Sequence, residues 1–328
     1  MTTRWGILGV GGIAGTFTEN LLAEGLAVQA VGARDGGRAQ AFADRFELPT
    51  AHTGYDALVN DPDVDAIYVS TPHNFHLEHA LLAIEAGKAV LIEKPVTVTA
   101  GEARQLAAAA QAAGVFAMEA MWARFLPSRT FVRDRIAAGA IGEVRAIQSQ
   151  HCQLLNSDPK ARLFNPELAG GALLDLGVYN VSFSVDLLGA PEAVLGRGTL
   201  TATGVDAETA MVLTHAGGAQ TSAYTSMIAP GYNAATITGT EGYFELAPTF
   251  YNWTTVRQFA AEPRGHLVET FDPQPTSRGM HFQALELERC LDQGLTDSPL
   301  HPLADSIATL EVLDELRRQV GAVLPQDR

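Results

Sequence analysis

A glycine loop between a strand pattern and a helix pattern constrains the fold of this chain more than any other feature. The apolar run 6–8 is typical of a buried strand, and Gly9-Val10-Gly11-Gly12-Ile13-Ala14 follows it directly. Apolar residues then recur at every fourth position through residue 21, which predicts a helix. In such a unit, Gly9 permits a tight turn, Gly11 lets the backbone approach a pyrophosphate, and Ala14 lets helix and strand pack closely. The helix N-terminus adds amide donors and a favourable dipole. We therefore predict a dinucleotide site that includes Gly9, Gly11, Gly12, Ile13 and Ala14.

Strand and helix patterns alternate through the first 120 residues. Further strands are expected at 28–33, 64–69, 89–92 and 115–118, and helices at 38–46, 77–84 and 99–113. This alternation predicts an α/β fold with a doubly wound parallel sheet. We assign residues 1–121 to this domain.

The pattern changes after Trp122. Alternating β-branched segments separated by turn signals follow, at 144–151, 209–214, 220–225, 234–240 and 243–246. They predict a mostly antiparallel sheet in a second, α+β domain, residues 122–328. Helices are expected there at 128–138, 171–188, 281–293 and 302–320.

Composition excludes several classes of function. Lysine and arginine number 22 against 37 aspartates and glutamates, a formal charge of −15, which argues against nucleic acid as a partner. An apolar segment of about 18 residues and a secretory signal are both missing, so we expect no membrane span and a cytoplasmic protein. The two cysteines, Cys152 and Cys290, lack metal-site spacing and are expected to be buried free thiols. We predict no metal site.

Arg34 favours NADP as the cofactor. NAD-binding folds place a carboxylate about 20 residues beyond the glycines, where it binds the ribose hydroxyls. Counted from Ala14, that position is Arg34, whose guanidinium can pair with a 2′-phosphate, and Arg38 could add a second cation. Asp35, one residue later, keeps NAD as the alternative.

Three side chains are candidates for catalysis. Lys94 follows the apolar run 89–92, at the carboxyl end of an expected strand, where open α/β sheets bind ligands. Asp175 and Tyr179 are four residues apart and share one face of an expected helix. A lysine cation about 4 Å from a phenolate attracts it by up to about 4 kcal/mol at an effective dielectric constant near 20, which suits Tyr179 to acid–base chemistry. On spacing alone, a rim lysine and a core tyrosine with a capping aspartate remain the alternatives.

Six segments together resemble the Gfo/Idh/MocA oxidoreductases over nearly the whole chain. Within that family the sequence is most similar to the dimeric trans-1,2-dihydrodiol dehydrogenases and the NADP-dependent D-xylose 1-dehydrogenases. The segments are Gly9–Ala14, Ala33-Arg34-Asp35 with Arg38, Thr71-Pro72-His73, Glu93-Lys94-Pro95, Glu119–Phe125 and Gly171–Tyr179.

The resemblance implies a Rossmann domain followed by an open-faced sheet domain that forms a homodimer, or a dimer of dimers, through that sheet. It places Lys94, Asp175 and Tyr179 around the substrate, and it implies that the Lys94–Pro95 bond is cis. It also assigns Lys94 and seven more residues to the cofactor site: Thr71, Pro72, His73, His76, Glu93, Trp122 and Arg124. The spacing of His73, His76 and His79 by threes drifts around a helix, which argues against a metal site.

These observations predict hydride transfer between NADP and a hydroxyl or carbonyl carbon of a pyranose sugar or cyclic diol. In the oxidative direction, Tyr179 takes the hydroxyl proton, Lys94 orients the oxygen, and Asp175 orients its neighbours. The alternatives are an anhydroketose reductase or another ring-carbon sugar dehydrogenase of the same fold, and a non-catalytic NADP-binding sensor.

Overall fold

The computed structural model describes residues 3–155, 158–262 and 265–327. The chain divides into two compact units. The first contains Met1–Trp122 together with Thr276–Ser306, and the second contains Ala123–Pro275 together with Ile307–Arg328. The chain therefore returns to the first unit after completing most of the second.

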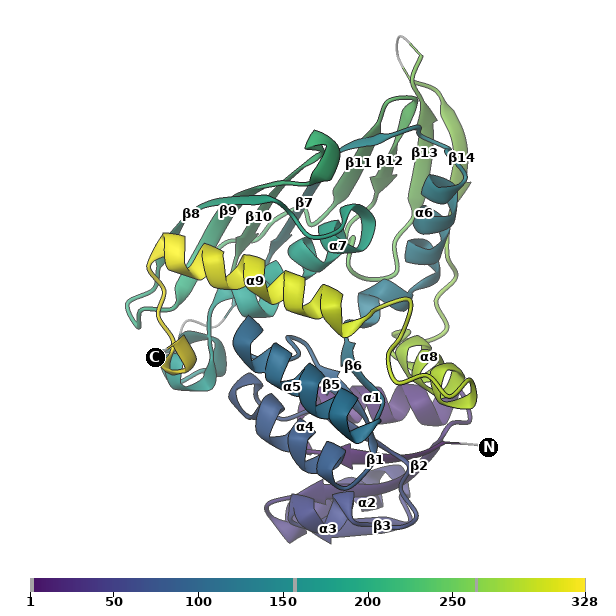
Figure 1. Ribbon diagram of the computed structural model, residues 1–328, viewed down its shortest axis with the longest axis vertical. Coiled ribbons are helices and arrows are strands. Elements are labelled where there is room, and N and C mark those ends of the chain that lie inside the picture. Colours follow the sequence, from purple (N-terminus) through teal and green to yellow (C-terminus); the bar gives the residue numbers. More distant parts are fainter. Residues whose placement is uncertain (1–2, 156–157, 263–264, 328) are drawn as a thin grey trace. The chain divides into compact units, whose positions relative to one another are not determined.

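The first unit is built on a six-stranded parallel sheet with the strand order β3-β2-β1-β4-β5-β6, the order of dinucleotide-binding folds. Helix α4 packs against α5, and α1 packs against α8 (Figure 1). This arrangement confirms the predicted doubly wound sheet. The strands are β1 Arg4–Leu8, β2 Ala27–Ala33, β3 Thr50–Thr53, β4 Ala66–Val69, β5 Ala89–Glu93 and β6 Ala117–Ala120. The helices are α1 Gly12–Ala23, α2 Gly36–Phe46, α3 Tyr55–Val59, α4 His76–Glu85, α5 Ala100–Ala113 and α8 His281–Asp292.

Local sequence explains why these elements form. Every residue of β4 and β5 is buried, as expected for parallel strands covered on both faces. Helix α5 begins with a capping box, in which Thr99 and Glu102 each accept a hydrogen bond from the other's backbone amide. It ends at Gly114, whose φ of 65° suits a left-handed C-cap.

The second unit is built on an eight-stranded sheet with the order β14-β13-β12-β11-β7-β10-β9-β8. Among the strand pairs of the described residues in this sheet, only β7–β10 is parallel, so the sheet is mostly antiparallel, as predicted. The strands are β7 Val144–Cys152, β8 Ala193–Leu200, β9 Asp206–Thr214, β10 Gln220–Ser226, β11 Ala235–Gly239, β12 Gly242–Leu246, β13 Val256–Ala260 and β14 Leu267–Phe271. The helices are α6 Pro127–Ala137, α7 Val178–Leu188 and α9 Leu303–Val320, whose first residues belong to the first unit.

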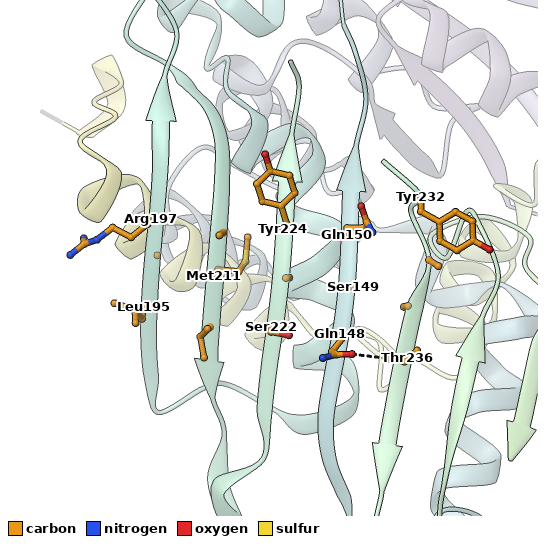
Figure 2. A pocket seen from close by; sticks show the side chains of 16 residues that line it. Gln148, Ser149, Gln150, Leu195, Arg197, Met211, Ser222, Tyr224, Tyr232 and Thr236 are labelled. Carbon is orange, nitrogen blue, oxygen red and sulfur yellow. Dashed lines mark hydrogen bonds between the residues drawn. The ribbon is translucent and has the colours of Figure 1, made fainter. Parts of the chain in front are cut away.

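Helices cover one face of this sheet and leave the other face open. Residues alternate strictly between buried and exposed positions from 209 to 213 in β9 and from 220 to 225 in β10. Helix α9 approaches β8 so closely that a Cβ on Gly196 would lie 2.5 Å from Leu316. The open face has a hollow of about 800 Å³, and Leu195, Val212 and Tyr224 lie on it at 58%, 40% and 36% exposure (Figure 2).

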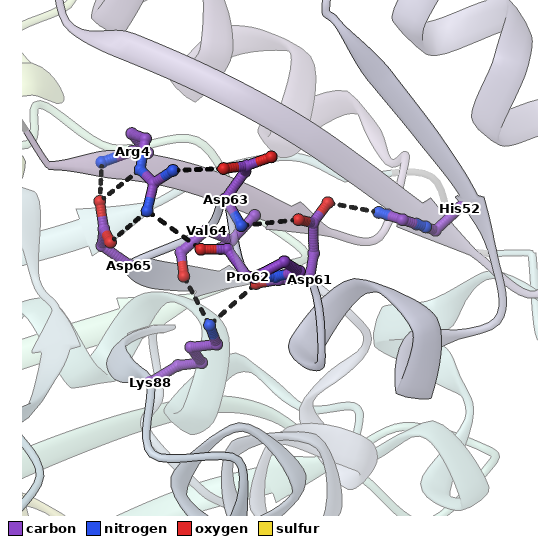
Figure 3. Close-up of polar contacts among 8 residues, drawn as sticks. All are labelled: Arg4, His52, Asp61, Pro62, Asp63, Val64, Asp65 and Lys88. Carbon is purple, nitrogen blue, oxygen red and sulfur yellow. Dashed lines mark hydrogen bonds and ion pairs between the residues drawn. The ribbon is translucent and has the colours of Figure 1, made fainter.

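A network of charges lies at the amino edge of the parallel sheet, where β1, β4 and β5 begin (Figure 3). Arg4 pairs with Asp63 at 2.7 Å and with Asp65 at 3.0 Å, and Lys88 donates to the carbonyl oxygen of Asp61 at 2.9 Å. The Arg4 guanidinium holds the pKa of Asp65 below its usual value. Because the Arg4 pairs are more than a third exposed, solvent screens them and they contribute little to stability. We interpret this network as structural.

One segment, Pro166–Leu188, is long and apolar enough to span a membrane by length and composition, with a mean hydropathy of 1.3. We expected no apolar segment of about 18 residues, and this segment corrects that expectation. In the described structure 89% of the window is buried inside the protein, as in a core helix.

Candidate active site

The glycine loop has the backbone geometry that a pyrophosphate requires. Gly9 has a φ of 105°, and a Cβ there would lie 3.0 Å from Ser70 Oγ, so a side chain would be strained. At Gly11 and Gly12, a Cβ would meet no described atom within 4 Å. Gly11 is the N-cap of α1 and has no side chain that could cover the helix end. The first amides of α1 therefore face open space, which fits the phosphates of a dinucleotide.

Two arginines lie beside the carboxyl end of β2. Arg34 and Arg38 are both exposed. Asp35 is the N-cap of α2, and its carboxylate accepts a hydrogen bond from the Arg38 amide at 2.9 Å. One oxygen of the carboxylate that could have favoured NAD is therefore engaged in capping a helix.

Buried histidines form hydrogen bonds to the loop that follows β4. His76 is fully buried, with Nδ1 2.8 Å from the Pro95 carbonyl oxygen and Nε2 2.7 Å from the Thr71 carbonyl oxygen. Carbonyl oxygens only accept, so a ring nitrogen bonds its carbonyl when it carries a hydrogen. His79 contacts Thr71 Oγ1 at 2.9 Å, and burial lowers the pKa of His79. His73 is buried in the turn that opens after Pro72. In the described parts of the chain, no group of three or more His, Cys, Asp or Glu side chains could hold a metal ion.

Lys94 follows β5 at the carboxyl edge of the same sheet. The Lys94–Pro95 bond is cis, as the family resemblance implied. The preceding residue, Glu93, is buried and accepts a hydrogen bond from the Tyr68 hydroxyl. Burial raises the pKa of Glu93 despite this bond. The Tyr68 ring in turn stacks on Phe17 of α1, with ring centroids 3.8 Å apart. The residue before the lysine is thus anchored inside the sheet.

A buried carboxylate holds the chain on the other side of Lys94. Glu119 in β6 accepts hydrogen bonds from the Val96 amide at 2.9 Å and from Ser306 Oγ at 2.7 Å, and it contacts His301 Nε2 at 3.1 Å. Glu119, His301 and Ser306 are each at most 1% exposed. Burial alone would raise the pKa of Glu119, but the His301 contact and the hydrogen bonds hold it below its usual value. Together with His76, Glu119 fixes the segment 95–96.

The second unit contains Asp175 and Tyr179. Asp175 lies in a π-helical turn, Leu173–Gly177, which leads directly into α7. The sequence predicted one regular helix over 171–188, so the π turn is a difference, and such turns are frequent at functional sites. Asp175 Oδ1 pairs with Arg162 Nη2 at 3.0 Å, and its side chain is 15% exposed.

Aromatic rings surround Tyr179. Its ring lies 5.1 Å from that of His151 and 5.3 Å from that of Tyr251, and His151 stacks on Tyr251 at 3.7 Å. His151 Nδ1 donates to the Leu176 carbonyl oxygen at 3.1 Å, so its Nε2 can accept from the Gln153 amide at 2.9 Å. A neutral imidazole satisfies both contacts.

The two remaining candidates lie in different units. Trp122, at the end of the first unit, is 3% exposed, and the Arg278 guanidinium lies 5.4 Å from its ring. Arg124 is in the second unit and is 2% exposed. Its Nη2 lies 3.4 Å from the Ser182 carbonyl oxygen and 3.8 Å from Asp186, both in α7.

Sequence reasoning missed several side chains that contact the candidates. Arg162 and Tyr251 lie outside the predicted helices and strands, and His151 ends a predicted strand. His301 lies at the border of a predicted helix. The sequence distinguishes these residues only by their chemical type, because the residues that they contact are distant in the chain.

Comparison with known proteins places these features in context. The family model for the GFO/IDH/MocA oxidoreductases, described as an oxidoreductase family with an NAD-binding Rossmann fold, matches residues 3–121, and the model of the GFO/IDH/MocA C-terminal domain matches residues 130–245. The chain is 36% identical over 341 residues to a mouse protein named trans-1,2-dihydrobenzene-1,2-diol dehydrogenase, with both chains covered completely.

Solved structures have the same fold. A 3-ketoreductase from Actinomadura kijaniata, in complex with NADP and TDP-benzene, is 27% identical with a TM-score of 0.85, and 98% of each chain is covered. A levoglucosan dehydrogenase, in complex with NADH and levoglucosan, is 21% identical with a TM-score of 0.86, again with 98% of each chain covered. At that identity, the second likeness shows the fold alone.

Proposed function

The chain belongs to the Gfo/Idh/MocA oxidoreductase family, and from that premise we propose that it is an NADP-dependent dehydrogenase acting on a pyranose sugar or a cyclic diol. One observation carries this proposal. The glycine loop after β1 and Lys94 after β5 lie at the carboxyl edge of one parallel sheet, with only β4 between the two strands. A phosphate-binding backbone and a cation on one edge suit a dinucleotide and an oxygen-bearing substrate side by side.

NADP is preferred over NAD in this proposal because of the charges at the end of β2. Arg34 and Arg38 supply two exposed cations there. The Asp35 carboxylate already accepts a hydrogen bond from the Arg38 amide. A 2′-phosphate would gain charge-assisted hydrogen bonds from the guanidinium groups. Among the similar structures, one was solved with NADP and another with NADH.

The three catalytic candidates have distinct roles. The cofactor, when bound, accepts or donates the hydride. Tyr179 receives the hydroxyl proton of the substrate as the alcohol is oxidised, and it returns a proton in the reverse direction. Lys94 orients the reacting oxygen and stabilises the negative charge that develops on it. Asp175, paired with Arg162, orients its neighbours in the second unit.

The proposed substrate class follows the names of the relatives. The name of the mouse relative specifies a cyclic diol, and the similarity to this relative extends over the whole chain. A second candidate is a reductase of a ring carbonyl, such as an anhydroketose, because the Actinomadura neighbour is named a 3-ketoreductase. A non-catalytic NADP sensor is the alternative from another class.

We further propose a homodimer formed through the open face of the eight-stranded sheet. The outward side chains there include Leu195, Val212 and Tyr224, and the hollow of about 800 Å³ lies among them (Figure 2). Exposed apolar side chains grouped around a hollow, with polar ones such as Gln148 and Arg197 beside them, favour a protein interface. A second copy is the proposed occupant, and a monomer in analytical ultracentrifugation would contradict it. The cytoplasmic location stays a prediction, which fractionation of the source cells would test.

A substrate panel tests the proposed reaction. Aldoses, inositols and dihydrodiols are incubated with NADP or NAD, and cofactor reduction is followed by absorbance. We expect turnover with NADP and loss of most turnover in Lys94→Met and Tyr179→Phe, while NADP binding survives in both. Unchanged turnover in either variant would remove that residue from the mechanism. Tight NADP binding without turnover across the panel would favour the sensor.

A further inference from the structure

A buried carboxylate in the second unit contacts the start of the segment that carries Asp175 and Tyr179. Asp206 opens β9 and is 1% exposed. Its Oδ2 accepts a hydrogen bond from the Leu173 amide at 2.6 Å, and the Ala172 amide also donates to its carboxylate. Leu173 begins the π-helical turn and lies two residues before Asp175. The carboxylate therefore caps this turn from a strand that is more than thirty residues away in sequence.

The chain leaves room for this carboxylate by placing glycine at position 171. Gly171 has a φ of 120°, and a Cβ there would overlap Asp206 Oδ1. Both the backbone conformation and the close approach of the carboxylate therefore require a residue without a side chain. Gly171 and Asp206 are matched to each other, although they lie in different elements.

We propose that Asp206 is a positioning residue, which fixes the start of the π-helical turn and thereby the placement of Asp175 and Tyr179. This inference rests on the proposed function for its catalytic consequence. The turn is held at its other end as well, because His151 donates to the Leu176 carbonyl oxygen. With amides fixed at one end and a carbonyl at the other, the position of Asp175 depends on contacts from β9 and β7.

The charge state of Asp206 is sensitive to pH near neutrality. Burial raises the pKa of Asp206 to about 7, although its amide donors and the attraction of Arg317 in α9 act in the opposite direction. Arg317 itself pairs with Asp314 at 2.8 Å and with Asp327 at 2.7 Å, which divides its attraction among three carboxylates. Because the folded-state pKa is raised above the ordinary value of 3.8, protonation stabilises the fold. That stabilisation is complete at pH values below about 4 and is lost as the pH rises through about 7.

Asp206→Asn tests the proposal with readouts that a general loss of stability would not reproduce. Hydrogen exchange followed by mass spectrometry reports on the peptide spanning residues 169–180, and kinetics report on kcat, KM and the Kd of NADP. We expect faster exchange in this peptide and a fall of at least tenfold in kcat, with NADP affinity within twofold of wild type. The free energy of unfolding of the wild-type protein should also fall relative to that of the variant as the pH rises from about 4 to about 7. Glu208→Gln, on the same strand, is the control and should change none of these quantities.

Gly171→Ala provides a second route if Asp206→Asn folds poorly. It keeps the carboxylate but forces it away from the amides, so the same peptide should lose protection and kcat should fall. Unchanged exchange and kcat in Asp206→Asn, or in Gly171→Ala, would overturn the proposal. If wild type turns over no substrate, the proposed function fails, and the exchange of residues 169–180 then decides the role of Asp206 without reference to activity.

Discussion

Glu119→Ala should destabilise the first unit more than most single substitutions in the chain. The variant removes the acceptor of the Val96 amide and of Ser306 Oγ, and it leaves His301 buried without its carboxylate. A hydrogen bond to a charged group contributes about 1.5–3 kcal/mol. Removing one partner of a buried charged pair costs about 3–5 kcal/mol, which is the loss we expect here. For a cooperative unit of about 150 residues, this corresponds to a fall in Tm of about 6–20 °C.

Urea denaturation and calorimetry would measure this loss, with Glu85→Ala as the control. Glu85 is an exposed glutamate on α4, and its replacement should change the free energy of unfolding by no more than about 0.5 kcal/mol. His301→Ala should cost a similar amount to Glu119→Ala, and the double variant should cost less than the sum, because both changes break one contact. A Glu119→Ala protein as stable as the control would refute the reasoning, as would strictly additive costs in the double variant.

The same contact gives the stability of the first unit a pH dependence. Because the pKa of Glu119 is held below its ordinary value of 4.5, the stabilisation is present above that pH. It is lost as the pH falls through the lower, folded-state pKa. The stability difference between wild type and Glu119→Ala should therefore shrink as the pH falls below the ordinary value of 4.5.

Three further predictions concern other parts of the chain. Arg34→Ala should weaken NADP binding by about 10- to 100-fold, the value of one charge-assisted contact, and leave NAD binding within twofold, and an equal loss for both cofactors in fluorescence titrations would contradict this. Gly9→Ala should lower the free energy of unfolding by about 1–2 kcal/mol, because its φ is 105° and Ser70 Oγ would lie 3.0 Å from the new Cβ, and a calorimetric Tm equal to wild type would contradict this. Cys290, whose pKa burial raises to about 11, and Cys152, whose pKa burial also raises, should react slowly with a thiol reagent at pH 8 until the chain is denatured, and rapid reaction of the folded protein would argue against both.

The parallel sheet was predictable because its strands carry strong local signals. A strand such as β5 is apolar from residue 89 to residue 92, since both faces are covered, and the glycine loop marks the entry to α1. Strands β3, β8, β13 and β14 escaped detection. They are short or lie at sheet edges with mostly exposed side chains, so burial imposes no clear pattern on them. Strand β6 begins at Ala117, two residues later than predicted, which is an ordinary error for a strand end.

The return of 276–306 to the first unit had no sequence signal. The pattern of this segment predicts an amphipathic helix. Amphipathicity does not show against which of the two hydrophobic cores such a helix packs. Its destination depends on pairings between distant residues, such as Trp5 Nε1 with Glu288 at 3.0 Å and Glu119 with His301 at 3.1 Å. The π turn at Asp175 was unpredictable for the same reason, because its contacts come from β7 and β9.

The contact between Glu119 and His301 also affects how the protein is made. The two residues are 182 positions apart, and a ribosome adds about 5–20 residues per second, so Glu119 waits about 10–35 s for its partner. Throughout that interval the nascent first unit lacks α8 and the partners of a carboxylate that it must bury. A chain released before residue 301 would therefore expose an unfinished nucleotide-binding core to proteases and chaperones, even though its first 121 residues were complete.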